Sequence, residues 1–457
     1  MDTTKKSIFQ ANVDFLNGPI LKSLVIFMIP IFISSIFQQF YNTCDTYVVG
    51  KFLGENSLAA ISSCSAIFDL FVGFGNGIGG GLAIVTGRAY GSGDREQIKK
   101  SVAASIVIAI VSSIIISIIG VIVLKPLLGW LNTPEAILDE AYGYIVLIAI
   151  FIIVMFSYNL CAGMMRAIGN SVMPLVFLVI SSLLNIVLDF LFIGPMNMGV
   201  KGAAIATVIA QGVSVIFCVI YIKAKVETLV PAKEHFKVDK ALYKEMISQG
   251  YAMGFMSSIV SIGSVILQSG INSLGTLTIA GHGAARKIYM FCNMPFIAMG
   301  QSCSAFIAQN RGANKPKRIV KALKQVYLYS IAMAVVVTLI LLPGAKPLVK
   351  FVTSSTESVI INNATKYLHV VGPFYAVLGI LMSSRFALQG IGEKLKPLVS
   401  SVIECVSKIF WALVLIPMFA YDAVVWCEPI IWCIMTAYLV FVLWTNPYIK
   451  NAKNSEE

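Results

Sequence analysis

The chain has 457 residues, of which 58% are apolar and 12% are charged, and its formal net charge is +12. Soluble domains carry about twice that share of charged residues, so the composition predicts an integral membrane protein and excludes an ordinary soluble one. The basic excess does not indicate nucleic-acid binding, because the Lys and Arg residues lie in alternate loops between apolar stretches.

The N-terminal segment, residues 1–19, is polar and lacks the features of a cleavable signal peptide. An apolar stretch, Leu24–Tyr41, follows it and contains Pro30. A proline inside a helix removes a backbone hydrogen bond and bends the helix. Pro30, like Pro295 in the second half, is therefore either a point of static curvature or a hinge used in alternating access.

Apolar stretches of about 20 residues, each long enough to cross a bilayer as a helix, recur along the chain. We expect about twelve of them, in an all-α polytopic membrane protein with two six-helix bundles. The predicted parts are a cytoplasmic segment at 1–19, the first bundle at 20–222, a cytoplasmic linker at 223–245, the second bundle at 246–445 and a cytoplasmic tail at 446–457. Examples of the stretches are Val102–Leu124, Ile145–Met165, Leu175–Ile193 and Val326–Leu342.

Basic residues predict how the chain is oriented in the membrane. About 25 of the 34 Lys and Arg residues fall in the loops on one side, which identifies that side as cytoplasmic. This set includes Arg166 and the segment Arg385–Lys396. Both termini are therefore expected in the cytoplasm.

The two halves of the chain repeat each other. The segment that starts at Gly91 corresponds to one that starts at Gly312, and at the same offset Lys125–Leu127 corresponds to Lys346–Leu348. Six spans return the chain to its starting side, so both halves enter the membrane in the same orientation. Parallel repeats of this kind are typical of transporters. Further matches are Leu53-Gly54 with Leu274-Gly275 and, after a two-residue slip, Gly169 with Gly392.

Asp189 lies deep in the fifth predicted span, and Asn185, four residues earlier, shares its helix face. Ionisable groups inside a bilayer are costly and are usually functional. Carboxylate and amide oxygens suit a hard cation, and a carboxylate removed from water can bind a proton instead. The alternative is a hydrated carboxylate near a helix end that has no role.

Asp45 ends a polar run in the first span that includes Gln38 and Tyr41. The run predicts a cavity wall, although ordinary solvation near the outer interface would also explain it. Thr207, in the sixth span, would add a hydroxyl oxygen or would bond within its own helix.

Other ionisable residues inside predicted spans allow two interpretations each. Asp69 has no obvious partner in the sequence. Glu404 and Lys408 are four residues apart in the favourable order and would neutralise each other while facing a cleft. Arg286 and Lys287 either reach outward to the interface or line a cavity.

No resident cofactor is expected. The nine cysteines show no metal-binding spacing, and none of the three histidines has a second histidine at helical spacing. The glycines of Gly73–Gly81 have no βαβ unit around them, so they indicate close helix packing rather than dinucleotide binding. The loop at Gly91 lacks the spacing of an ATP site, so an ion gradient, of H⁺ or Na⁺, should supply the energy.

The order of several motifs resembles the multidrug and toxic compound extrusion (MATE) family over roughly residues 15–445. The resemblance implies a V-shaped pair of six-helix bundles that exports organic cations or drugs in exchange for Na⁺ or H⁺. It also implies a cation site at Asp45, Asn185, Asp189 and Thr207, as in the branch similar to DNA-damage-inducible protein F. Spans seven and ten lack the acidic residues of the NorM-like branch. The motifs are Pro30, Asp45–Gly54, Leu58–Ala60, Gly87–Gly91, Pro295, Gln309–Ala313, Gly390–Gly392 and Pro397.

We therefore expect a monomeric secondary antiporter of the inner (cytoplasmic) membrane, without enzymatic activity, ATP or a nucleic-acid partner. Ion binding or protonation at Asp45 and Asp189 would change the packing of the first span around Pro30 and so switch access. A cationic, amphipathic substrate would sit between the bundles. Its predicted contacts are Phe37, Gln38, Tyr41, Asp69, Met256, Arg286, Met290, Glu404 and Lys408.

Two alternatives remain at this point. Arg286, Lys287 and Lys408 inside the membrane would suit a flippase or exporter for a lipid-linked or anionic substrate. A membrane-embedded enzyme would need an Asp-rich or His-Asp loop motif, which the sequence lacks.

Mismatches in the repeat predict which half holds the coupling ion. At the matching offsets the four oxygen-bearing residues of the first half face residues that cannot replace them. Only the first half should therefore bind the ion. The pairs are Asp45 with Ile266, Asn185 with Lys408, Asp189 with Ala412, and Thr207 with Ile430.

Overall fold

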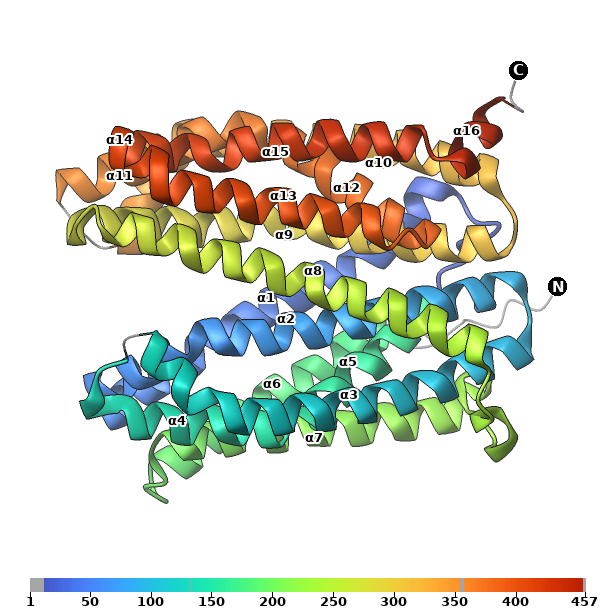
Figure 1. Ribbon diagram of the computed structural model, residues 1–457, viewed down its shortest axis with the longest axis horizontal. Helices are drawn as coiled ribbons and strands as arrows, with labels where there is room; N and C mark the ends of the chain where they lie inside the picture. The colour runs from blue at the N-terminus through green and yellow to red at the C-terminus, as the bar shows by residue number, and fades with distance from the viewer. Residues whose placement is uncertain (1–11, 132, 354–356, 455–457) are drawn as a thin grey trace. The chain divides into compact units, whose positions relative to one another are not determined.

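The computed structural model describes residues 12–131, 133–353 and 357–454, which form helices and no β-strand (Figure 1). The predicted all-α membrane class is confirmed. Part of the predicted segment 1–19 and the last three residues of the predicted tail lie outside the described residues.

Long helices account for most of the first half of the chain. Two short 3₁₀ turns, η2 (Glu227–Leu229) and η3 (Lys233–Phe236), form the polar connection to the second half. The helices are α1 (Ile20–Leu53), α2 (Glu55–Ser92), α3 (Arg95–Trp130), α4 (Glu135–Ile150), α5 (Ile152–Ala167), α6 (Val172–Ile193) and α7 (Gly199–Lys225).

The second half follows the same plan, with a 3₁₀ turn, η4 (Gly372–Phe374), and a π-helical turn, η5 (Trp411–Leu415), as its irregular parts. Its helices are α8 (Lys240–Asn272), α9 (Thr276–Gly312), α10 (Pro316–Thr353), α11 (Ser358–Val371), α12 (Tyr375–Ile391), α13 (Leu395–Phe410), α14 (Ile416–Phe419), α15 (Tyr421–Trp444) and α16 (Pro447–Asn454).

The sequence repeat is visible in the helix boundaries. Helices α2 and α9 begin at Glu55 and Thr276, which are separated by the main offset of the sequence repeat. Helices α6 and α13 begin at Val172 and Leu395, which are separated by that offset plus the two-residue slip. Packing repeats as well, because α2 lies against α5 in the first half and α9 lies against α12 in the second.

Ten helices or continuous helix groups of the described chain are long and apolar enough to cross a membrane, or eleven if α4 and α5 form one span. Those two helices are bent by 49° relative to each other, so the predicted span Ile145–Met165 is broken near Phe151. The sequence predicted about twelve spans. The helix missing from this count is α9, which has 37 residues but is too polar to be counted as apolar enough to cross a membrane.

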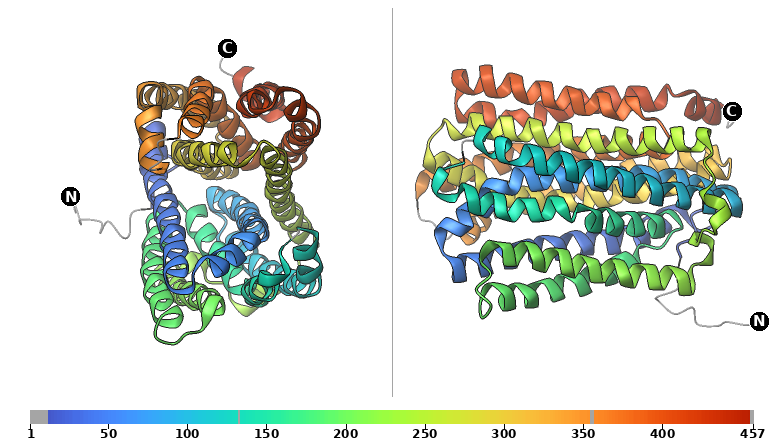
Figure 2. Two further views of the ribbon diagram at one scale, coloured as in Figure 1. Left: turned by 90° about the vertical axis from the view of Figure 1, so that its left-hand side faces the viewer. Right: turned by 60° about the horizontal axis from the view of Figure 1, so that its bottom comes forward.

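The chain divides into two units, within each of which the long helices run side by side (Figure 2). The first unit comprises the described residues up to Asp14 and Ile29–Phe255, and the second comprises Phe15–Met28 and the chain from Met256 onward. Helices α1 and α8 therefore each contribute to both units. The predicted boundaries at 222 and 246 follow the sequence repeat instead.

Phe15 explains why the start of α1 belongs to the second unit. Its fully buried ring packs edge-on against Phe27 and Phe306, with ring centroids 5.0 and 5.4 Å away. The side-chain amide of Asn310 donates to the Phe15 carbonyl at 3.0 Å. Apolar burial and a satisfied backbone carbonyl together fix this segment on α9.

The glycines of α2 allow close helix packing, as the sequence predicted. A Cβ atom at Gly77 would lie 2.5 Å from the carbonyl oxygen of Met253, and one at Gly81 would lie 2.6 Å from that of Gln249. Both partners belong to the part of α8 in the first unit. The absence of side chains thus lets the two helix backbones approach each other directly.

Candidate functional site

The four residues of the predicted cation site come together inside the first unit. Asp45 lies on α1, Asn185 and Asp189 on α6, and Thr207 on α7. Asp189 is fully buried, Asn185 and Thr207 are buried, and Asp45 is half-buried. The carboxyl groups of Asp45 and Asp189 lie within hydrogen-bonding distance of each other.

Helical periodicity on α6 points the polar pair inward. Leu183, Val187 and Leu191 expose 58, 62 and 45% of their surface, whereas Asn185 and Asp189 are buried. Residues three or four apart share one face of a helix. The large apolar side chains therefore cover the outside of α6, and the amide and carboxyl groups face the interior of the unit.

Asn185 connects Asp189 to α7. Its side-chain amide is oriented so that both the nitrogen and the oxygen have hydrogen-bond partners. Nδ2 donates to Asp189 Oδ2 at 3.0 Å, and the amide oxygen accepts from the Thr207 backbone N–H at 3.2 Å. The Thr207 hydroxyl lies 3.4 Å from the Tyr41 hydroxyl. Helices α1, α6 and α7 thus all supply oxygen atoms to one small region.

The paired carboxyl groups have no basic partner. Among the described residues no Lys, Arg or His forms an ion pair with Asp45 or Asp189. One buried oxygen of each, Oδ1, also has no hydrogen-bond partner in the described part of the chain. Two adjacent ionised carboxylates are strongly unfavourable inside a protein, so the pair needs a proton or a cation.

A proton and a Na⁺ ion would each fit this arrangement. A shared proton would convert the contact into a carboxyl–carboxylate hydrogen bond. A Na⁺ ion would find carboxylate, amide and hydroxyl oxygens, which are the ligands that hard cations prefer.

The second unit holds a buried string of opposite charges. Lys408 Nζ lies 2.9 Å from Glu404 Oε1, as the sequence predicted for this pair, and 3.6 Å from Glu428 Oε1. Arg385 contacts Glu404 at 3.3 Å, and Arg286 contacts Glu428 at 3.5 Å. Both carboxylates are thus already neutralised by cations, unlike those of the first unit.

Sequence reasoning missed two members of this string. Arg385 was assigned to a cytoplasmic loop, but it lies within α12, is 6% exposed and contacts Glu404. Glu428, on α15, was not a candidate at all. Its position in the otherwise apolar run Val424–Trp432, next to Pro429, was the available signal, since an isolated carboxylate in a span requires a partner.

The other predicted substrate contacts are divided between the two units. In the first unit Phe37 and Tyr41 are half-buried, and Gln38 and Asp69 are exposed. A common substrate site that includes them stays a prediction.

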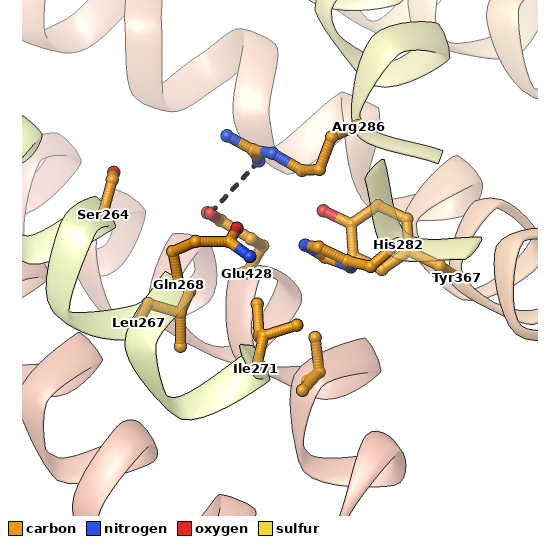
Figure 3. Close-up of a pocket in the computed structure, with 9 residues that line it drawn as sticks. Ser264, Leu267, Gln268, Ile271, His282, Arg286, Tyr367 and Glu428 are labelled. Atoms are coloured by element: carbon orange, nitrogen blue, oxygen red, sulfur yellow. Dashed lines mark ion pairs between the residues drawn. The ribbon is translucent and has the colours of Figure 1, made fainter. Parts of the chain in front are cut away.

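In the second unit, Arg286 lines a cavity (Figure 3). The Met256 sulfur accepts a hydrogen bond from Gln389 at 3.3 Å. Met290 and Lys287 are exposed on α9. Lys287 thus does not share the environment of its neighbour Arg286.

Pro30 and Pro295 lie inside helices that continue on both sides of them, α1 and α9. Neither helix is divided at its proline. The proposed role of these prolines as hinges stays a prediction.

A cluster of Glu96, Glu234 and His235 near the connection between the halves has the spacing of a metal site. The Ala232 backbone N–H donates to His235 Nδ1 at 2.9 Å, which leaves the ring proton on Nε2. Nε2 faces Glu96 Oε1 at 3.4 Å and is therefore positioned to donate to it. A hydrogen bond thus accounts for the contact between His235 and Glu96.

Comparisons with known proteins agree with this architecture. A model of the MatE family matches residues 30–191 and 252–414, once in each half. The chain is 27% identical to the probable multidrug resistance protein YpnP of Bacillus subtilis (strain 168) over 406 residues, which cover 88% of each protein. It is 25% identical to the multidrug export protein MepA of Staphylococcus haemolyticus (strain JCSC1435) over 424 residues, which cover 90% of each.

The fold also matches solved structures. One of them is described as an outward-facing conformation of a multidrug resistance MATE family transporter of the MOP superfamily. It superposes with a TM-score of 0.88 at 22% identity, covering 99% of this chain and 100% of that chain. Because the family model matches more than half of the chain, the protein belongs to the MatE family.

Proposed function

We propose that this protein is a secondary active transporter that exports organic cations or drugs by antiport with H⁺ or Na⁺. The observation that carries the proposal is the contact between the Asp45 and Asp189 carboxyl groups without a basic partner. Relatives named as multidrug export and multidrug resistance proteins support the export of drugs.

The coupling mechanism follows from the charge of the site. When a proton or Na⁺ binds, the Asp45–Asp189 pair loses negative charge, and α1 and α6 can pack closely there. When the ion leaves, repulsion between the carboxylates favours a different packing of α1. An ion that binds the two packings with different affinity shifts the equilibrium between them, and an organic cation would compete for the state with the free carboxylates.

Branch, orientation and assembly are further parts of the proposal. The segments Gly250–Gln268 and Tyr367–Ser384 contain no acidic residue, which supports the branch similar to DNA-damage-inducible protein F. The excess of Lys and Arg in alternate loops supports an inner-membrane protein with both termini in the cytoplasm. We propose that the monomer is the working unit.

Export of an anionic or lipid-linked substrate is less well supported. That alternative depended on three basic residues of the second half, Arg286, Lys287 and Lys408. Lys408 contacts two carboxylates, Arg286 contacts one, and Lys287 is exposed.

Asp189→Asn tests the proposal. The purified protein would be reconstituted in liposomes, and efflux of a fluorescent organic cation such as ethidium would be followed under an imposed ion gradient. We expect the stimulation by the gradient to fall about tenfold or more, because a neutral amide cannot exchange charge with the ion. Asp139→Asn, at a 93% exposed carboxylate of the same unit, is the matched control and should behave like wild type. Unchanged ion dependence in Asp189→Asn would show the proposal to be wrong.

A further inference from the structure

The charge string of the second unit is not balanced. It runs Arg385–Glu404–Lys408–Glu428–Arg286, so that three cations alternate with two carboxylates. Each carboxylate already lies between two cations. Among the described residues one positive charge therefore remains without a counter-charge in this part of the membrane domain, where an uncompensated charge is costly.

We propose that the cavity beside Arg286 binds the carboxylate of a small organic acid, which completes this charge string. The cavity lies wholly within the second unit and has a volume of about 100 Å³. A single water needs about 10–15 Å³, so the cavity is large enough for a small polar group and part of the body attached to it.

Only one of the three cations is accessible to a ligand. The Lys408 and Arg385 side chains are 3% and 7% exposed, and Arg385 is further enclosed by Ser400 and Met435. The Arg286 side chain is 34% exposed and lines the cavity. The excess charge of the string can therefore be neutralised from outside only at Arg286.

Arg286 is held in position for such a contact. Its guanidinium stacks over the Tyr289 ring, 4.6 Å from the centroid, and one nitrogen lies 3.5 Å from Glu428. A guanidinium has five N–H donors in a planar fork, so these contacts leave donors for a carboxylate. A fixed arginine also loses little conformational entropy when a ligand binds.

The rest of the cavity lining suits a carboxylate on an apolar body. The Tyr367 hydroxyl is buried, lies next to Arg286 and has no well-formed hydrogen bond among the described residues. In Figure 3 this hydroxyl and the Gln268 amide point toward the space beside Arg286. Apolar side chains close the remaining wall: Leu267, Ile271 and Val424.

The charged and titratable groups around the cavity set the class of ligand. Glu428 is the one carboxylate in the lining, and its Oε1 is bound by both Lys408 and Arg286. His282 also lines the cavity, and its Nδ1 lies 3.5 Å from the Tyr421 hydroxyl. Because the unbalanced charge is one unit, a monocarboxylate fits better than a phosphate group, which would bring more charge.

Binding of benzoate is the direct test, and it does not depend on the transport function proposed above. The thermal unfolding midpoint of the full-length protein in detergent would be measured with sodium benzoate, with the neutral isostere benzamide, and with sodium chloride at equal ionic strength. We expect saturating benzoate to raise the midpoint by about 2 °C or more and the other two to leave it unchanged. Equal shifts with benzoate and benzamide, or no shift with benzoate, would overturn the proposal. The wild-type protein is sufficient for this measurement.

Two neighbouring residues provide matched variants. Arg286→Gln should abolish the benzoate shift, whereas Lys287→Gln, which removes the same charge at the exposed adjacent position, should keep it. Tyr367→Phe should reduce the shift by removing one donor. A shift that persists in Arg286→Gln, or is lost equally in Lys287→Gln, would contradict a site at Arg286. If Arg286→Gln does not fold, the Tyr367→Phe and Lys287→Gln comparison decides the question.

Discussion

The carboxyl groups of Asp45 and Asp189 lie within hydrogen-bonding distance of each other, although the residues are far apart in the sequence and on different helices. Neither has a basic partner among the described residues, and one oxygen of each has no hydrogen bond. A stable structural role would require a cation or hydrogen-bond donors at this contact. A bound proton or Na⁺ ion, as proposed above, would meet this requirement.

Asp45→Asn should uncouple transport, because the remaining carboxylate of Asp189 would no longer experience repulsion that an ion can relieve. We expect the stimulation of organic-cation efflux by an ion gradient to fall about tenfold or more in proteoliposomes. An Asp45→Glu variant, which keeps the charge, should retain part of the stimulation. Equal loss in both variants would indicate that packing, rather than charge, matters at this position.

Asn185→Ala should destabilise the first unit. Asp189 Oδ2 would lose the amide that donates to it, and an unsatisfied buried polar group costs about 1–3 kcal/mol. Thermal unfolding in detergent measures the effect. Asn185→Asp preserves the size of the side chain but adds a third carboxyl group, so it should raise the dependence of the unfolding midpoint on pH. A midpoint equal to that of wild type in Asn185→Ala would show that the amide does not support Asp189.

Gly81→Ala should disrupt the packing of α2 against the first part of α8. The added methyl group would lie 2.6 Å from the Gln249 carbonyl oxygen, so the backbones must separate, at a cost of about 1–3 kcal/mol. Gly80→Ala is the control, since its methyl group would meet only the flexible end of Met253 at 3.2 Å. The yield of folded protein and the unfolding midpoint should fall in the first variant and not in the second.

Glu404→Gln should be far more damaging than the loss of an exposed ion pair. It removes the charge that both Arg385 and Lys408 contact, and breaking a buried pair in this way costs about 3–5 kcal/mol. Lys366→Ala, which breaks the exposed pair with Asp422, should cost less than about 1 kcal/mol.

The double variant Glu404→Gln with Lys408→Gln tests whether the string acts as a unit. It should destabilise the protein by less than the sum of the two single variants, because it leaves fewer unpaired charges. Additive effects on the unfolding midpoint would mean that Glu404 and Lys408 do not interact.

The sequence predicted the features that depend on local spacing. Helices α2 and α9, and helices α6 and α13, begin at residues separated by the two offsets of the sequence repeat. The four-residue spacing of Asn185 and Asp189 places both on the buried face of α6. The pairing of Glu404 with Lys408 followed from the same rule.

Features that depend on tertiary packing were not accessible in this way. Arg385 was placed in a loop because it lies close to the end of an apolar stretch, yet α12 continues beyond it to Ile391. Its partner Glu404 is on another helix, so no spacing in the sequence connects the two. The assignment of Phe15–Met28 to the second unit likewise depends on contacts with residues far away in the sequence, such as Phe306.

The dependence of transport on ion gradients tests the central claim most directly. Proteoliposomes that contain the wild-type protein would be loaded with a fluorescent organic cation, and efflux would be measured under an inward Na⁺ gradient, an inward H⁺ gradient and neither. If the Asp45–Asp189 pair couples transport, one of the two gradients should accelerate efflux, and Asp189→Asn should remove that acceleration. An efflux rate in the wild-type protein that is blind to both gradients would contradict the account.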